Sequence, residues 1–368
     1  MSHGLRLGVI GAGTITQSVH LESARRAGFT LTRVCDLSLS RAAEVSRLTG
    51  AGGTTDPAQV YGASDVDAVL IATPGRHAPL AVAALSAGKH VLIEKPVALS
   101  RSEIDAVSSA ATNARRVAQV GYMKMYDPLM SAAAADVAAL AGVRLVRITV
   151  QHPADALQIA HLRMAPPAQD ADADLIAADD AAERAEVAAE LPWAGEDLRT
   201  YYRNVLNGSV IHEFSVLRAL GLPLPTRWTA EVFPELGGSE PASLLATATV
   251  GSSRYVLSWN WLPNLPAYEE DVTVLGTDGT VTLELARPYQ VEAASVLTTV
   301  RAAPEGRRST RTQGPAETGF LRQLDEFARC ITTGAAPRSN LDGAARDLDQ
   351  IRLLAEAIDR SHRELAHV

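Results

Sequence analysis

The chain has 368 residues, of which 47% are hydrophobic and 21% charged, a balance typical of a folded globular protein. Its length predicts two domains. The formal net charge of −8 excludes a basic surface, so neither nucleic acid nor an anionic membrane is expected as a partner. The only two cysteines, Cys35 and Cys330, lie far apart without metal-ligand spacing, which indicates the cytoplasm and no metal site. The sequence shows neither a signal peptide nor an apolar run long enough to span a membrane.

The first third of the chain alternates apolar runs with helical patterns. A segment with helical spacing follows most of these runs. This alternation predicts a parallel sheet with helices on both faces, in a nucleotide-binding Rossmann domain over residues 1–124. The predicted strands are 5–10, 31–36, 66–74, 90–96 and 116–122.

A glycine-rich turn follows the first predicted strand. Gly8, Gly11 and Gly13 let the backbone turn tightly and approach a pyrophosphate at the N-terminus of the next helix, although Thr16 replaces the third glycine of the usual pattern. Such a triplet alone also fits an ordinary tight turn. Its position between a strand and a helix favours a dinucleotide site.

Asp36 ends the second predicted strand. A carboxylate there accepts hydrogen bonds from the ribose hydroxyls of the cofactor and repels the 2′-phosphate of NADP, so NAD is the expected cofactor. NADP stays possible, because Ser38 and Arg41 could hold a phosphate.

A charged pair interrupts the fourth predicted strand. Leu92 and Ile93 are apolar, yet Glu94 and Lys95 follow at once, and burying their charges is costly unless they are matched. Pro96 restricts the backbone, and the Lys95–Pro96 bond is a candidate for the cis form. A lysine at a strand end can also simply reach solvent.

Several motifs together carry a resemblance to a known family. They are "ATPGRH" at 72–77, "EKP" at 94–96, "GYMKMYDP" at 121–128, "IHEFSVLRALG" at 211–221, "VLGTDGTVTLE" at 274–284 and the segment 320–351. On these motifs the chain resembles the Gfo/Idh/MocA family of NAD(P)-dependent oxidoreductases. The resemblance implies a C-terminal α/β domain over 125–368 with a large, mostly antiparallel sheet. It also implies oxidation or reduction of secondary alcohols of sugars, cyclitols and related polyols.

The resemblance also implies roles for individual residues. Lys95 matches the lysine that touches the reacting hydroxyl near the nicotinamide, and His212 matches the histidine across the substrate from it, a suitable proton acceptor. His77 either lines the nicotinamide side or caps the following helix. The implied substrate-binding residues are Tyr122, Lys124 and His212; the implied cofactor-binding residues are Gly11, Gly13, Thr14, Ile15, Asp36, Ala72, Thr73, Pro74, His77, Glu94 and Lys95.

The sequence departs from the family pattern close to His212. Many members carry an aspartate four residues before the histidine, where this chain has Gly208, and an acidic residue three after it, where Ser215 stands; Glu213 adjoins the histidine. Two other functions therefore stay open. One is a glycosidase-like eliminase that uses NAD for transient oxidation, and the other is a non-catalytic sensor of sugar or NAD.

The remaining segments have no chemical motif. Residues 153–200 are alanine-rich and acidic and have no counterpart in the resemblance, and we expect them to form one or two solvent-facing helices in an insertion. "TDGT" predicts a hairpin, 304–314 an exposed loop, and 318–333 and 342–361 two final helices. One face of the second sheet, rich in Val, Leu, Trp259 and Trp261, is expected to be covered by another subunit in a homodimer or homotetramer.

Overall fold

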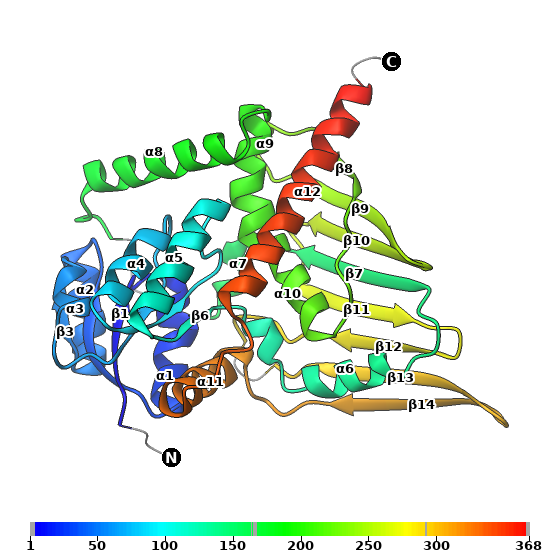
Figure 1. Ribbon diagram of the computed structural model, residues 1–368, viewed down its shortest axis with the longest axis horizontal. Helices are drawn as coiled ribbons and strands as arrows, with labels where there is room; N and C mark the ends of the chain where they lie inside the picture. Colours follow the sequence, from blue (N-terminus) through cyan, green and yellow to red (C-terminus); the bar gives the residue numbers. More distant parts are fainter. Residues whose placement is uncertain (1–3, 163, 165–167, 291–292, 366–368) are drawn as a thin grey trace. The chain divides into compact units, whose positions relative to one another are not determined.

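The computed structural model describes residues 4–162, 164, 168–290 and 293–365, which form two compact units (Figure 1). Unit 1 contains Met1–Met123, Leu162–Pro192 and Phe320–Ala345. Unit 2 contains Lys124–His161, Trp193–Gly319 and Arg346–Val368. The first segment of unit 1 thus ends at Met123, one residue before the predicted end of the first domain.

Unit 1 is built on six parallel strands in the order β3-β2-β1-β4-β5-β6. This confirms the predicted Rossmann sheet. The order reverses between β1 and β4, and parallel sheets of this type bind ligands outside the carboxyl ends of the strands at such a point. The strands are β1 (Arg6–Ile10), β2 (Thr30–Cys35), β3 (Gly52–Thr54), β4 (Ala68–Ile71), β5 (His90–Ile93) and β6 (Ala118–Val120).

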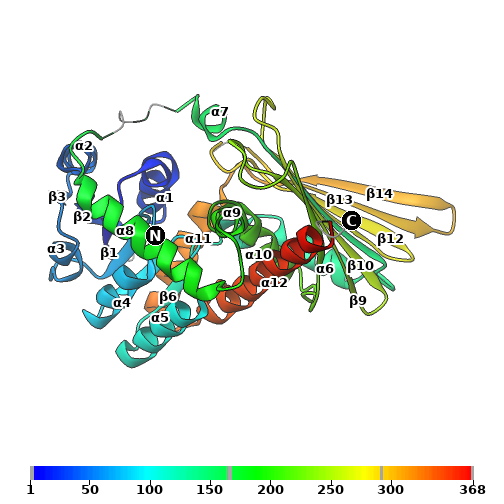
Figure 2. The same cartoon turned by 90° about the horizontal axis from the view of Figure 1, so that it is seen from above.

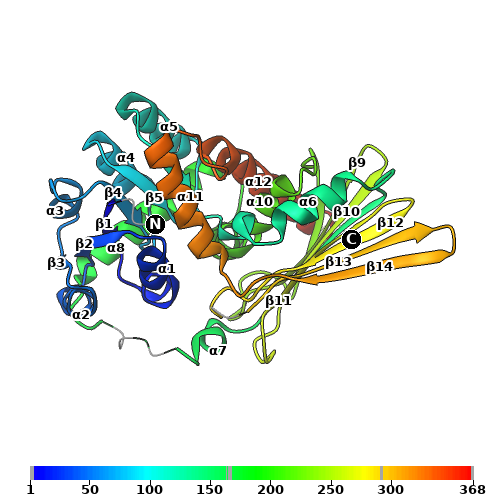
Figure 3. The same ribbon diagram turned by 90° about the horizontal axis from the view of Figure 1, so that it is seen from below.

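Short helices connect these strands and begin at the carboxyl edge of the sheet (Figure 3). Ser38 caps the helix after β2, and Ser100 caps the helix after β5, since each hydroxyl accepts from a backbone N–H in the first turn. Both helices therefore start where the sequence offers a serine after a strand. The helices are η1 (Thr16–His20), α1 (Leu21–Arg26), α2 (Leu39–Thr49), α3 (Ala58–Tyr61), α4 (Ala78–Ser86) and α5 (Arg101–Ala114).

Two later segments, both predicted for the second domain, belong to unit 1. Helix α11 (Gly319–Thr333) buries Leu324 and Phe327 in the core that contains Leu7 and Phe29. The strongly amphipathic sequence of this helix needs an apolar partner, and the sheet of unit 1 provides it. The other segment carries α8 (Ala173–Glu190), which makes polar contacts with Arg76 and Ser100 in the same unit.

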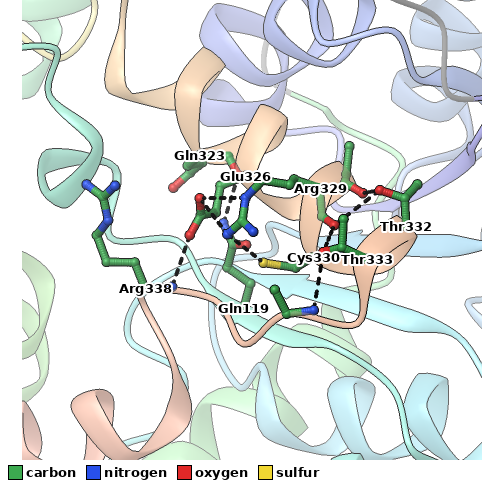
Figure 4. Close-up of polar contacts among 10 residues, drawn as sticks. Gln119, Gln323, Glu326, Arg329, Cys330, Thr332, Thr333 and Arg338 are labelled. Carbon is green, nitrogen blue, oxygen red and sulfur yellow. Dashed lines mark hydrogen bonds and ion pairs between the residues drawn. The ribbon is translucent and has the colours of Figure 1, made fainter.

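Polar contacts fix α11 beside the edge strand β6 (Figure 4). The Gln119 amide donates to the carbonyl oxygen of Gln323 at 2.8 Å, and Glu326 accepts from the backbone N–H of Arg338 at 3.3 Å. Ser339 then pairs with Val120 through its backbone and its hydroxyl. The predicted division of the chain at residue 124 therefore omits an element that completes the first core.

Unit 2 is built on an eight-stranded sheet in the order β14-β13-β12-β11-β7-β10-β9-β8. Only β7 and β10 pair in parallel, so the predicted mostly antiparallel sheet is confirmed, as is the hairpin at "TDGT". The strands are β7 (Leu145–His152), β8 (Thr229–Phe233), β9 (Ser243–Val250), β10 (Ser253–Trp261), β11 (Glu269–Leu275), β12 (Gly279–Glu284), β13 (Val296–Ala303) and β14 (Gly306–Gln313).

The prediction of a loop over 304–314 is wrong, because β14 pairs with β13 along its whole length. Its side chains are exposed on both faces, so the sequence lacks the alternation of polar and apolar residues that marks a half-buried strand. Backbone pairing and the turn at Gly306, where φ is +125°, define the hairpin instead.

Helices cover one face of the second sheet (Figures 1 and 2). Trp259 faces this side, where it is buried and donates to the Ser209 hydroxyl at 2.9 Å. The opposite face carries polar side chains such as Gln151, Asp271 and Glu284, so the expectation of an uncovered Val-, Leu- and Trp-rich face is wrong.

The remaining helices are η2 (Met123–Tyr126), α6 (Met130–Ala138), α7 (Asp155–Ile159), α9 (Glu196–Tyr201), η3 (Tyr202–Val210), α10 (Ile211–Ala219) and α12 (Leu341–Leu365). None of the helices in the described ranges is long and apolar enough to cross a membrane.

Unit 2 encloses a buried charged cluster around Lys124. The Lys124 ammonium lies 2.6 Å from Glu270, 3.2 Å from Glu213 and 3.3 Å from the Tyr268 hydroxyl. Because an ammonium has three N–H groups, these three partners can engage all of them. Burial, and then the neighbouring Glu270, raise the pKa of Glu213 well above its usual value, so folding favours the protonated form of this carboxyl group.

Substitution Glu213→Gln should stabilise the protein increasingly as the pH rises. Glutamine has the shape of the protonated acid but does not ionise. Since the pKa of Glu213 is raised in the folded chain, wild-type stability declines from about pH 4.5, the ordinary pKa of the group, upward toward the folded value. The unfolding temperatures of wild type and variant should therefore be closest near that pH and diverge above it, as circular dichroism melts can measure.

Lys124→Met serves as the comparison, because it leaves two buried carboxyl groups without their cation and should lower the unfolding temperature. An equal difference between Glu213→Gln and wild type at every pH would contradict a protonated Glu213.

Candidate cofactor site and catalytic residues

The glycine turn after β1 closes tightly against the loop after β4. Gly11 has φ of +97°, and a Cβ there would lie 2.5 Å from the carbonyl group of Ala72. Only glycine fits this approach. A Cβ at Gly13 would meet no atom within 4 Å, so the turn leaves open space beside it. Thr14 is exposed and Ile15 half-buried at the start of the following helix.

Thr16, which replaces the third glycine of the pattern, has a structural role in this turn. Its hydroxyl donates to the carbonyl oxygen of Gly11 at 2.5 Å. The turn is therefore held by a side chain at the position where a glycine usually allows close helix packing.

Asp36 is fixed at the end of β2 by two backbone groups. One carboxylate oxygen accepts from the N–H of Ala12 and the other from the N–H of Ser38, both at 2.9 Å. The negative charge thus lies directly beside the glycine turn. This is the arrangement expected of a carboxylate that receives the ribose hydroxyls of a dinucleotide.

His77 joins the loops that follow β4 and β5. One ring nitrogen lies 2.7 Å from the carbonyl oxygen of Thr73 and the other 2.7 Å from that of Pro96. The side chain makes no capping hydrogen bond to α4, so the capping alternative does not hold. Ala72 is buried and Pro74 exposed in the same loop, which lies at the carboxyl edge of the sheet.

Glu94 is a buried carboxylate with matched partners. It accepts from the His20 ring at 2.8 Å and from the backbone N–H of Lys95 at 3.1 Å. A Cβ at Gly121 would lie 3.0 Å from its carboxyl group, so glycine makes room for it. Burial would raise the pKa of Glu94, but the hydrogen bond to His20 and the charge of Lys95 outweigh burial and lower it.

Sequence reasoning missed His20. A partner 74 residues away cannot be identified from local pattern, and the only available signal was a histidine on the helix after the glycine turn. Lys95 itself is half-buried at the end of β5, and its peptide bond to Pro96 is cis, as hypothesised.

His212 lies in unit 2, at the start of α10, and is 7% exposed. The preceding η3 is a π-helix, in which the N–H of Ile211 bonds to the carbonyl oxygen of Leu206, five residues earlier. In this wider turn Asn207 as well as Gly208 lies about one turn before His212. Position 208, where the family pattern has its aspartate, is therefore not the only position one turn before His212.

Asn207 is a second residue that the sequence pattern did not single out. It is fully buried, and its amide donates to the carbonyl oxygen of Tyr202 at 3.0 Å. Its side-chain oxygen, also shielded from solvent, has no hydrogen-bond partner among the described residues. Asn207 thus offers an acceptor near the predicted catalytic histidine.

The structure brings the predicted cofactor residues together at the carboxyl ends of β1, β2, β4 and β5 in unit 1. The predicted substrate residues are divided between the units. Tyr122 is fully buried in unit 1, Lys124 belongs to the charged cluster of unit 2, and His212 begins α10. Within the described part of the chain, no group of His, Cys, Asp and Glu side chains could hold a metal ion.

The first comparison concerns sequence relatives. Residues 5–122 match the oxidoreductase family with an NAD-binding Rossmann fold, Gfo/Idh/MocA. Inositol 2-dehydrogenase 4 of Saccharopolyspora erythraea is 42% identical over 128 residues, which make up 34% of this chain and 38% of that enzyme. An inositol 2-dehydrogenase of Rhodococcus erythropolis is 39% identical over 128 residues, covering 33% of this chain and 37% of its own length. The match therefore spans less than half the length of these relatives.

Solved structures extend the likeness in fold to the rest of the chain. The 3-ketoreductase KijD10 of Actinomadura kijaniata, solved with NADP, has a TM-score of 0.71 at 17% identity and covers 97% of both chains. UDP-N-acetylglucosamine 3-dehydrogenase of Acidithiobacillus ferrooxidans has a TM-score of 0.72 at 19% identity, covering 97% of this chain and 98% of its own. Residues 5–122, with the glycine turn and Asp36, are therefore similar to the NAD-binding Rossmann fold of the Gfo/Idh/MocA oxidoreductases, and the rest of the chain shares their fold.

Proposed function

We propose that the protein is an NAD-dependent oxidoreductase that interconverts a secondary alcohol and a ketone of a sugar, cyclitol or sugar derivative. The observation that carries this proposal is the Asp36 carboxylate, which is held between the N–H groups of Ala12 and Ser38 beside the open space at Gly13. These residues fit the ribose and pyrophosphate of a dinucleotide. The names of the sequence relatives support a cyclitol as substrate.

When bound, the nicotinamide supplies the acceptor or donor of the hydride. We assign the proton to this chain's own residues. Lys95 follows a buried strand at the carboxyl edge, where its ammonium can polarise the C–O bond of the substrate. The Glu94–His20 pair holds the backbone N–H of Lys95 and thereby fixes the start of this loop. His212 takes the hydroxyl proton during oxidation and returns it during reduction.

The remaining parts of the proposal concern assembly and compartment. We propose a homodimer or homotetramer through the sheet of unit 2, supported by the exposed Leu245 on β9. We propose the cytoplasm as the compartment, because both Cys35 and Cys330 are free thiols.

Substitution Lys95→Ala should lower kcat/KM by about 10²- to 10⁴-fold, the usual contribution of a group that assists proton transfer. The measurement is absorbance at 340 nm with NAD and a panel of inositols and sugars. Lys95→Arg is the matched control for charge, and binding of NAD to both variants checks that the cofactor site is intact. Unchanged turnover in Lys95→Ala would refute the assignment. If the wild-type protein binds NAD but turns over no member of the panel, a sensor is favoured.

Substitution Asn207→Asp should move the acidic limb of the pH–rate profile to higher pH. A carboxylate one turn before His212 would stabilise the imidazolium form and so raise the pKa of this proton acceptor. The pH dependence of kcat/KM and the NMR titration of the His212 ring give two independent readouts. Asn207→Ala, which adds no charge, is the control. A His212 titration that is the same in all three proteins would show that position 207 does not act on the histidine.

A further inference from the structure

The acidic, alanine-rich segment that includes α8 contacts the Rossmann loops of unit 1 at several helix N-termini. We call residues 168–190, which include α8, the strap (Figures 1 and 2). Near its C-terminal end, Glu186 accepts from the hydroxyl of Ser100, the residue that caps α5, and Glu190 accepts from the N–H of Arg101 at 3.4 Å. Carboxylates are favoured at such positions by the partial positive charge of a helix N-terminus.

The middle of the strap contacts the turn before α4. Asp179 accepts from the N–H of Arg76 at 3.4 Å, and its carboxylate fills the position that a Cβ at Gly75 would occupy. Contacts in the middle and at the C-terminal end of the strap thus fix its position on unit 1.

Asp170, near the start of the strap, contacts the loop that follows Asp36. Its carboxylate accepts from the Ser38 hydroxyl at 2.5 Å, and from the N–H and hydroxyl of Ser40 at 2.9 and 2.8 Å. These hydrogen bonds to the charged form lower the pKa of Asp170. Ser38 in turn caps α2 by accepting from the N–H of Arg41.

The donors that Asp170 occupies are those that an additional phosphate would need. In dinucleotide-binding sheets, the acidic residue ending the second strand binds the ribose hydroxyls, and groups just beyond it accommodate a 2′-phosphate. Here those groups are Ser38, Ser40 and the guanidinium of Arg41, whose solvent-shielded Nε has no hydrogen-bond partner among the described residues. Only one anion can use the serine donors at a time, and a second anion would be repelled.

We propose that Asp170 determines the preference for NAD over NADP by placing its carboxylate where the 2′-phosphate would bind. This inference rests on the proposed function, because it requires that unit 1 binds a nicotinamide dinucleotide. Asp170 lies outside the Rossmann sequence, and its carboxylate would compete with a phosphate held by Ser38 and Arg41.

The test is calorimetric titration of the purified full-length protein with NAD and with NADP. Asp170→Ala should bind NADP about tenfold more tightly than wild type, while its affinity for NAD stays within about threefold. Asp170→Asn, which keeps the shape but removes the charge, should change NADP affinity in the same direction by a smaller factor. Asp174→Ala, which removes an exposed carboxylate elsewhere on the strap, should change neither affinity.

A second variant identifies the group that receives the phosphate. Adding Arg41→Ala to Asp170→Ala should abolish the gain in NADP affinity. Once the Asp170 carboxylate is gone, the Arg41 guanidinium is the cation expected to bind the 2′-phosphate. The inference is overturned if wild type binds NADP as tightly as NAD, or if both Asp170 variants bind NADP as wild type does. Failure of wild type to bind either dinucleotide would instead overturn the proposed function, so the two failures are distinguishable.

Discussion

The close approach of Gly11 to the carbonyl group of Ala72 is the contact on which the candidate site depends. It occurs where the strand order of the Rossmann sheet reverses, so the loops after β1 and β4 meet there. Any side chain at position 11 would push these loops apart. Asp36, which bonds to the N–H of the next residue, Ala12, would then lose the backbone donor that fixes its carboxylate.

A second constraint is the matching of buried charge. Glu94 interrupts an apolar strand at little cost because His20 and a backbone N–H receive its charge, while Gly121 leaves space for it. In unit 2 the Lys124 ammonium lies within 3.2 Å of both Glu213 and Glu270, and burial raises the pKa of Glu213. Both arrangements join segments far apart in sequence, and both fix residues next to predicted catalytic positions.

The strap brings acidic side chains to the loops around the candidate cofactor site. Its carboxylates contact the residues that begin helices of the Rossmann domain, where backbone N–H groups lack partners within the helix. An acidic, alanine-rich sequence is suited to this role. Hydrogen bonds from hydroxyl and backbone N–H groups to its carboxylates hold the helix, so few apolar contacts are needed. The acidic composition of this segment predicted only a solvated helix. Some of its carboxylates are in fact specific hydrogen-bond acceptors.

The sequence by itself determined the Rossmann strands, the glycine turn, Asp36 and the hairpin of the second sheet, because each depends on local periodicity or on a residue type required at one position. The residues proposed to bind the cofactor lie together because the carboxyl ends of parallel strands meet at one edge. Tertiary structure alone decided that α11 completes the first core, that 306–313 is a strand, that His20 receives Glu94 and that Asp170 reaches Ser38. Each of these depends on partners distant in sequence, and a local pattern of polarity carries no record of which distant group will satisfy a hydrogen bond or cover an apolar face.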